Sequence, residues 1–246
     1  MYQLPELPTL PNLNHGFSTN DAGNMSFKWG EEKEVATNRH KFLDKLKLEA
    51  KNGVTAKLGQ GDKIIRVGKK ETNKGMSKND YQLQADGLIT NEPGIFLMHV
   101  VADCLSLLLY DQEHQAIGLG HLGRTGTSAL LSKRMVDMMV NEFSTQPEKL
   151  IVGIGPGIHQ CCYTFNQIPP DLNSSWQPFL NQGKDQRLSI NLVGYNLYQL
   201  SEAGVEQENI FISEYCTAHS GKFFSHYRDI QEKKPEARFA TIIGLK

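Results

Sequence analysis

Two apolar runs in the middle of the chain place the strongest limit on its fold. They cover residues 95–102 and 105–110, and only Asp103 and Cys104 separate them. Apolar runs of this length between turn-forming residues are typical of buried β-strands. Because an unpaired carboxylate is costly to bury, Asp103 should have a hydrogen-bonding partner or reach solvent. The stretch therefore predicts two buried strands with a polar step, and a thiol, between them.

A third short apolar run, residues 116–120, ends at His121 and leads into a Gly-Arg-Thr-Gly loop at residues 123–126. Thr127 is interpreted as the N-cap of a following helix. That helix is indicated by apolar residues at helical spacing: Leu131, Met135, Met138 and Met139. Backbone N–H groups at a helix start suit an anion. The sequence thus predicts that Cys104 and His121 lie at strand ends beside an anion-binding loop.

Composition excludes several classes of protein. The 246 residues include 26 basic and 27 acidic side chains, for a formal net charge of -1, so no basic excess favours nucleic-acid binding. No apolar run reaches membrane-spanning length, and the N-terminal segment lacks the pattern of a signal peptide. Four cysteines, two of them adjacent at Cys161 and Cys162, do not form a disulfide scaffold. We therefore expect a cytoplasmic protein with reduced thiols and no membrane partner.

The order of the expected elements favours an α+β fold in a single domain spanning residues 1–246. Strands outnumber helices and do not alternate strictly with them, and no repeat or linker interrupts the chain. The patterns predict helices over residues 31–47 and 193–203, two short strands around a turn in residues 55–67, and closing strands over residues 223–227 and 239–245.

Short segments along nearly the whole chain are similar to those of one known family. They are HGFST from His15, DGLIT from Asp86, PGIFLMHVVADC ending at Cys104, GHLGRTGT from Gly120, GPGIHQCCYTF from Gly155, FFSHYRD from Phe223 and RFATIIGL from Arg238. The chain thus resembles the laccase-domain family, whose members are described as polyphenol oxidases, purine nucleoside phosphorylases or a peptidoglycan editing factor. The resemblance implies a central β-sandwich flanked by helices in a four-layer α/β/β/α arrangement, with a His-Cys-His metal centre.

Carried over by position, Cys104 is similar to the cysteine ligand of that centre and His121 to its second histidine. The position of the first histidine holds Gln60. A neutral amide oxygen is a poor ligand for zinc or copper, so the resemblance implies a zinc or copper ion that is weakly held. Another histidine could complete the ligand set. The candidates are His159, His99 and His219, of which His159 is the most attractive because it departs from the family pattern.

The resemblance further implies a metal-dependent phosphorylase for a purine nucleoside such as adenosine or inosine, with phosphate as the second small-molecule substrate. Arg124, Thr125 and Gly126 would bind the phosphate that attacks the anomeric carbon of the ribose. Asp103 would protonate or hydrogen-bond the departing purine, and Arg228 would orient the sugar or the anion. A metal-bound hydroxide could instead attack the adenine ring and deaminate adenosine.

Three alternatives remain open. A laccase-like polyphenol oxidase needs redox copper, and one cysteine, one histidine and one amide are far from a multicopper ligand set. A catalytically weakened family member that acts by ligand binding is favoured by Gln60 and by the altered loop. A metal-free cysteine hydrolase would use Cys104 with His121. The sequence predicts no oligomeric state.

Overall fold

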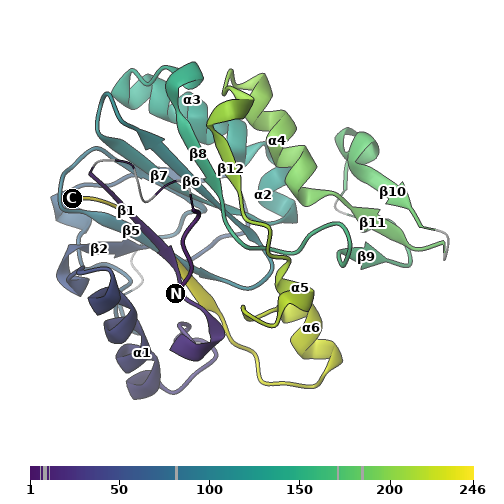
Figure 1. The fold of residues 1–246 in the computed structure, drawn as a ribbon, viewed down its shortest axis with the longest axis horizontal. Coiled ribbons are helices and arrows are strands. Elements are labelled where there is room, and N and C mark those ends of the chain that lie inside the picture. The colour runs from purple at the N-terminus through teal and green to yellow at the C-terminus, as the bar shows by residue number, and fades with distance from the viewer. Residues whose placement is uncertain (6, 8–9, 11, 81–82, 171, 184–185) are drawn as a thin grey trace.

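Two stacked β-sheets form the centre of the molecule (Figure 1), in a computed structural model that describes residues 1–5, 7, 10, 12–80, 83–170, 172–183 and 186–246. The four-stranded sheet contains, from edge to edge, β1 (Leu13–Phe17), β13 (Phe239–Leu245), β5 (Phe96–Val101) and β2 (Gly53–Thr55). The six-stranded sheet contains β12 (Ile210–Ile212), β8 (Ile151–Ile154), β6 (Leu105–Asp111), β7 (Ala116–Leu122), β4 (Gly87–Thr90) and β3 (Ile64–Arg66). A small separate sheet contains β10 (Leu180–Gln182), β11 (Leu188–Ile190) and β9 (Thr164–Phe165).

Helices cover the outer faces of both large sheets. The three longer ones are α1 (Glu32–Lys45), α3 (Leu131–Phe143) and α4 (Leu192–Glu202), and the short ones are α2 (Arg124–Ser128), α5 (Thr217–Ser220) and α6 (His226–Gln231). Short 3-10 helices include η2 (Asn20–Ala22) and η6 (Ser174–Phe179). Figure 1 shows α1 on one side of the stacked sheets and α3 and α4 on the other. This arrangement confirms the predicted α+β fold with α/β/β/α layers.

Strand periodicity explains how one apolar run serves two cores. In β6, Leu108 and Tyr110 belong to the core between the two sheets, whereas Leu107 and Leu109 belong to the core beneath α3 and α4. Successive side chains of a strand point to opposite faces, so a strand that is covered on both faces is apolar at every position. A third core lies between α1 and the four-stranded sheet. The run that the sequence predicted as buried strand is therefore the central element of the fold.

Helix α1 follows its sequence pattern closely. The side chain of Glu31 accepts hydrogen bonds from the backbone N–H groups of Lys33 and Glu34, which caps the first turn. The buried face of the helix carries Val35 and Phe42, at the spacing expected for an amphipathic helix.

Three local predictions were wrong. Of the two short strands expected in residues 55–67, only β3 lies in that range, because β2 ends at Thr55 and belongs to the other large sheet. Residues 223–227 do not form a strand, because Ser225 accepts a hydrogen bond from the backbone N–H of Arg228 and so begins α6. Thr127 does not cap α3. It lies inside α2, and α3 begins after Leu130, which has a positive φ of 60°.

None of the helices in the described part of the chain is long and apolar enough to cross a membrane.

Candidate active site

The two neighbouring strands β6 and β7 bring Cys104 and His121 together. Cys104 directly precedes β6, and the antiparallel register pairs Ser106 with His121. The thiol of Cys104 is hydrogen-bonded to the buried imidazole of His121. A methyl group at Gly123 would lie 3.1 Å from the Cys104 sulfur and 3.7 Å from Nε2 of His121, so this position needs glycine to leave the pair open. Two residues that are 17 positions apart thus converge because of the strand pairing.

Asp86 holds the other side of His121 and was given no role by the sequence. Its Oδ1 lies 2.9 Å from Nδ1 of His121, and its backbone carbonyl accepts the His121 N–H at 2.7 Å. The carboxylate also accepts three consecutive backbone N–H groups, from Gly59, Gln60 and Gly61, at 2.9–3.1 Å. Asp86 and His121 therefore lock each other in place, and Nε2 of His121 is directed to Cys104.

The surroundings of His121 favour its protonated form. Burial alone would lower the pKa of His121, but the Cys104 sulfur and the Asp86 carboxylate raise it to about 9. Burial likewise opposes ionisation of Asp86, yet hydrogen bonds from His121 and Gly61 bring the pKa of this carboxyl below its usual value. At neutral pH the metal-free site thus contains an imidazolium between a carboxylate and a sulfur atom.

Gln60 reaches this site through its backbone. Its N–H donates to the same Asp86 oxygen that contacts His121, its φ is 54°, and its side chain is exposed. The backbone of Gln60 is therefore linked to the imidazole through Asp86, by two successive hydrogen bonds.

The three other candidate histidines lie in different surroundings. The ring centroids of His99 and His121 are 6.2 Å apart, but Nε2 of His99 is 2.8 Å from the Ser106 hydroxyl. Nδ1 of His219 lies 3.2 Å from the Cys162 sulfur, so this residue joins a separate cysteine cluster. His159 lies beside that cluster as well, because its backbone N–H donates to the sulfur of Cys216.

Asp103 is fully engaged within the fold. Its Oδ1 accepts the Thr217 hydroxyl at 2.5 Å and its Oδ2 accepts the Tyr227 backbone N–H at 2.7 Å. This buried carboxylate has the partners that the sequence analysis required. Arg228 makes similar internal contacts, with Asp229 and with the carbonyls of Thr217 and Phe223. Asp103 thus joins α5 and α6 to the segment that carries Cys104, and Arg228 joins α6 to α5 and to residue 223. The roles of both residues toward substrate remain predictions.

The loop after β7 lies next to the Cys104–His121 pair. Gly123 precedes α2, and a methyl group at Gly126 would lie 3.1 Å from the His121 carbonyl oxygen and 3.2 Å from that of Gly61. Arg124 is half-buried, donates to the Tyr163 hydroxyl at 3.3 Å and lies over the ring of Phe165. Thr125 is exposed. The guanidinium of Arg124 thus contacts Tyr163 and Phe165, and phosphate binding by the loop residues remains a prediction.

The donor atoms fit a metal ion only in part. A thiol and an imidazole whose second nitrogen contacts a carboxylate are typical of zinc sites. Catalytic zinc sites have three protein ligands, however, and this pair supplies two strong ones beside the exposed amide of Gln60. The set does not match a complete His-Cys-His centre.

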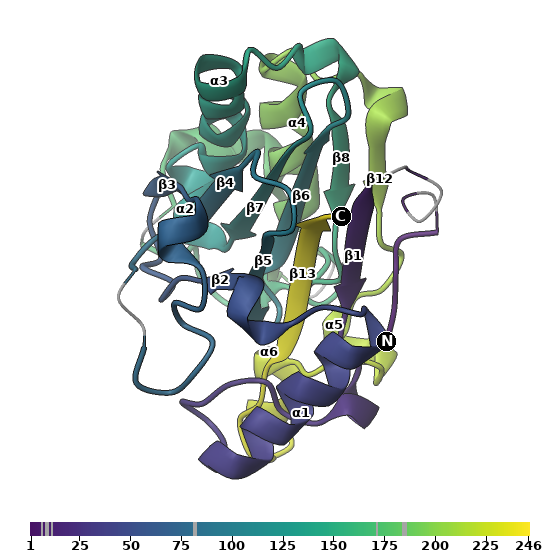
Figure 2. The ribbon, with the colours of Figure 1, turned by 90° about the vertical axis from the view of Figure 1, so that its left-hand side faces the viewer.

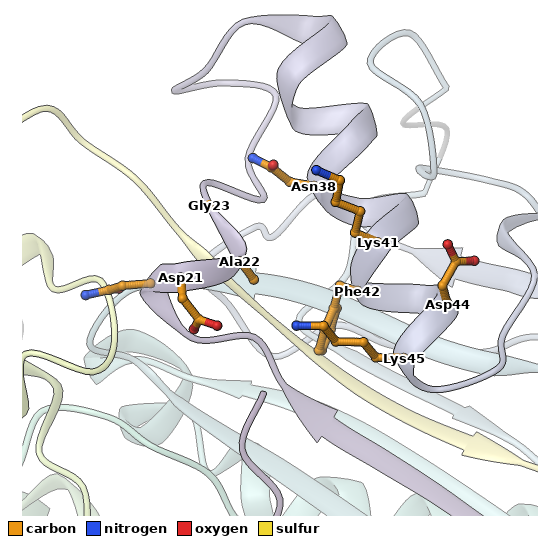
Figure 3. A pocket seen from close by; sticks show the side chains of 9 residues that line it. Asp21, Ala22, Gly23, Asn38, Lys41, Phe42, Asp44 and Lys45 are labelled. Carbon is orange, nitrogen blue, oxygen red and sulfur yellow. The ribbon is translucent and has the colours of Figure 1, made fainter.

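A surface hollow of about 440 Å³ lies away from this site, between η2 and α1 (Figure 3). Its lining includes Asp21, Lys41 and Lys45, and none of the site residues. A second, open hollow of about 630 Å³ is lined by Asp62, Arg134 and other residues around β3 and α3. Neither hollow brings together groups with the chemistry of Cys104 and His121.

Comparison with known proteins gives consistent results. The sequence profile of the family described as "Multi-copper polyphenol oxidoreductase laccase" matches residues 12–246. Purine nucleoside phosphorylase YlmD of Bacillus subtilis is 27% identical over 241 residues, which cover 96% of this chain and 82% of that protein. The corresponding protein of Geobacillus stearothermophilus is 29% identical, with 91% and 83% covered. The crystal structure of Bacillus licheniformis hypothetical protein YfiH has a TM-score of 0.85 and 30% identity, covering 95% of this chain and 93% of that one.

Proposed function

Because the chain belongs to the multi-copper polyphenol oxidoreductase laccase family, we propose that it is a purine nucleoside phosphorylase-like enzyme that cleaves adenosine or inosine with phosphate. Relatives that match most of the chain are named purine nucleoside phosphorylases. The observation that carries the proposal is the convergence of Cys104 and His121, with His121 fixed by Asp86. Preorganised polar groups of this kind, beside a glycine that leaves them accessible, suit the stabilisation of a charged leaving group.

The proposed reaction exchanges one bond at the anomeric carbon. An oxygen of phosphate attacks this carbon, the bond from carbon to the purine nitrogen breaks, and the departing base takes the bonding electrons and needs a proton. His121 is suited to supply that proton, since its pKa of about 9 keeps it protonated at neutral pH. Arg124, with Thr125 and Gly126, would hold the phosphate.

Asp103 is best placed as a positioning residue in this proposal. Both of its carboxylate oxygens accept internal hydrogen bonds, from Thr217 and Tyr227, so they fix the backbone next to Cys104. Arg228 supports the same region through its contacts with Thr217 and Phe223. We thus assign the proton transfer to His121. The alternative within this proposal is that Asp103 protonates or hydrogen-bonds the departing purine.

Metal dependence and deamination are the finer parts of the proposal. A zinc or copper ion between Cys104 and His121 would be held weakly, because it has two strong ligands and must displace the proton from His121. Deamination of adenosine would need such an ion to activate water, so it should appear only when metal is supplied.

The test is release of base from adenosine or inosine by purified protein, with and without phosphate, followed by chromatography. Release should require phosphate and should be lost in Cys104→Ala. His40→Ala is the control, because His40 is an exposed side chain on α1. Release that persists undiminished in Cys104→Ala would overturn the proposal.

One observation favours a second function. Sulfur, imidazole and carboxylate occur in the order Cys104, His121 and Asp86, which is the order of groups in cysteine hydrolases. A metal-free hydrolase would be inactivated by iodoacetamide and form an acyl-enzyme with activated esters. Phosphate-dependent base release would distinguish the phosphorylase from this alternative.

A further inference from the structure

A second group of metal-binding side chains lies outside the candidate active site. It consists of Cys161, Cys162, Cys216 and His219, which we call the cysteine cluster. Two of its members come from the loop that leads from β8 to β9. Of the other two, Cys216 is the N-cap of α5 and His219 lies in its last turn. The parallel bridge between Gly157 and Cys216, with the hydrogen bond from Thr217 N–H to the Gly157 carbonyl, joins these segments. No member of the cluster is part of the Cys104–His121 pair.

The spacing of the donor atoms suits a tetrahedral ion. One donor atom from each residue lies within 4.8 Å of all the others. The sulfur atoms of Cys161 and Cys162 are 3.6 Å apart, and Nδ1 of His219 lies 3.8 Å from the first and 3.2 Å from the second. Around zinc, with Zn–S of about 2.3 Å and Zn–N of about 2.0 Å, tetrahedral ligand atoms are about 3.5–3.8 Å apart. The cluster is therefore close to the geometry that zinc binding needs.

Neighbouring groups support the cluster as a site. The backbone N–H of His159 donates to the sulfur of Cys216 at 3.4 Å, a contact that stabilises a thiolate ligand. Nε2 of His159 is buried and has no hydrogen-bonding partner among the described residues. Cys216 is buried, whereas Cys161 and His219 are exposed, so an ion has a route of entry from solvent.

We propose that Cys161, Cys162, Cys216 and His219 bind one zinc ion as a structural Cys3His site. The soft thiolates and the imidazole are the donors that zinc prefers, and four protein ligands close the coordination shell. This proposal is independent of the proposed phosphorylase activity.

Binding would exchange protons for the ion. A cysteine must lose its proton to become a zinc ligand, so zinc binding releases protons from the thiols of the cluster. Binding should therefore weaken as the pH falls.

The ion would reinforce the active site through Asp103. The Ile158 N–H donates to the Asp103 carbonyl at 2.7 Å, and the Thr217 hydroxyl donates to its carboxylate. Both segments that carry the cysteine cluster are thus bonded to the residue before Cys104. Zinc that joins these segments would limit the motion of Asp103 without contacting substrate.

The test is zinc content after chelator-stripped protein has been reloaded with zinc and freed of excess ion. We expect one tightly held zinc per chain in the parent, in Cys104→Ala and in the surface control His40→Ala. Cys162→Ser and His219→Ala should lose it, and the melting temperature of the parent should rise with zinc while theirs does not. The proposal is overturned if the parent retains no zinc, or if Cys104→Ala loses the ion and Cys162→Ser keeps it.

A spectroscopic measurement covers the case in which Cys162→Ser does not fold. Cobalt replaces zinc in tetrahedral sites and gives thiolate-to-metal charge-transfer bands. In Cys104→Ala, which lacks the other candidate thiolate ligand, these bands should persist with tetrahedral d–d absorption and be abolished by one equivalent of zinc. Cobalt spectra without thiolate bands in this variant would contradict the Cys3His site.

Discussion

The Cys104–His121 pair and the cysteine cluster bring cysteine and histidine side chains together in two different ways. The pair of Cys104 and His121 is built on adjacent strands and fixed by a buried carboxylate, but it offers two strong metal ligands. The cysteine cluster is built on a loop and a four-residue helix, and it offers four ligands. The Cys104–His121 pair is therefore the poorer metal site. The cysteine cluster has the fuller ligand set, but its four protein ligands leave no coordination position for a substrate.

This difference has a practical lesson for assigning function. Zinc found in the purified protein does not by itself identify a catalytic metal, because the cysteine cluster would retain it more strongly than Cys104 and His121. Metal content and turnover must be measured separately in variants of each site.

The largest effect is expected from His121→Gln, which removes the proposed proton donor while keeping a polar side chain. Turnover should fall by about 100- to 10,000-fold, the contribution typical of general acid catalysis. His114→Gln is the control, since His114 also contacts a carboxylate at 2.9 Å, on Asp111 at the far end of β6. Zinc held by the cysteine cluster should be unchanged. Equal turnover in both variants would remove His121 from the mechanism.

A gain of function is expected from Gln60→His. Histidine tolerates the positive φ of 54° at this position, and its nitrogen is a far better ligand than an amide oxygen. Metal affinity at the Cys104–His121 pair should rise at least about 10- to 100-fold, the range known for supporting groups of metal sites. Calorimetric titration with metal should compare Cys162→Ser with the double variant that also carries Gln60→His. The Cys162→Ser substitution removes the signal of the cysteine cluster.

Gln186→His is a matched control for that gain. Gln186 is exposed with a φ of 63°, so the control adds an imidazole in the same backbone conformation on the segment between β10 and β11. Higher affinity with unchanged turnover would indicate that the loop around Arg124 limits catalysis. Equal affinity in both variants would show that residue 60 does not face the pair.

A smaller loss is expected from Asp86→Asn. The amide keeps the shape of the side chain but removes the charge that raises the pKa of His121. Turnover should fall about 10- to 100-fold, as for other residues that orient a functional histidine, and the pH at which activity declines should move downward. Asp111→Asn is the control, because Asp111 contacts His114 in the same way. An unchanged pH profile would contradict the orienting role.

The smallest effect concerns a histidine remote from both sites. Nε2 of His15 accepts the Leu4 N–H, and burial lowers its pKa to about 4 against an ordinary value of 6.5. The folded state thus binds this proton less readily than the unfolded state, so stability is present above pH 6.5 and falls as the pH drops toward 4. The slope is about 1 kcal/mol per pH unit. When stability is measured by denaturant unfolding at several pH values, His15→Gln should lose less stability per pH unit than the parent. An identical pH dependence in the two proteins would exclude His15.

The sequence predicted the elements whose pattern is local. The strands β5, β6 and β7 and the helices α1, α3 and α4 follow from apolar periodicity, and Cys104 and His121 follow from their places at strand ends. The family resemblance supplied the four-layer arrangement, which periodicity alone does not specify.

What the sequence missed depends on contacts between distant segments. Asp86 lies 35 residues before His121, and only the register of β4 and β7 shows that it is the carboxylate partner. The glycine-rich turn at Gly59–Gly61 was a signal for a bound carboxylate, since consecutive backbone N–H groups in such turns often surround an anionic group. The cysteine cluster joins residues 57 positions apart, which no local pattern reveals. The segment at residues 223–227 is not a strand, because Ser225 caps α6, which begins at His226.

The position of β13 sets the order in which a ribosome-bound chain can fold. This strand lies between β1 and β5 (Figure 2), so the four-stranded sheet has a gap until residues 239–245 have been synthesised. Thr241 of this strand is 2.7 Å from the Ser106 hydroxyl, which in turn contacts His99 beside His121. A nascent chain that already contains Cys104 and His121 would therefore lack the inner support of its active site, and the edges of β1 and β5 that pair with β13 would be unpaired. During translation these two strands would be the surfaces most open to chaperone binding or to pairing with other chains.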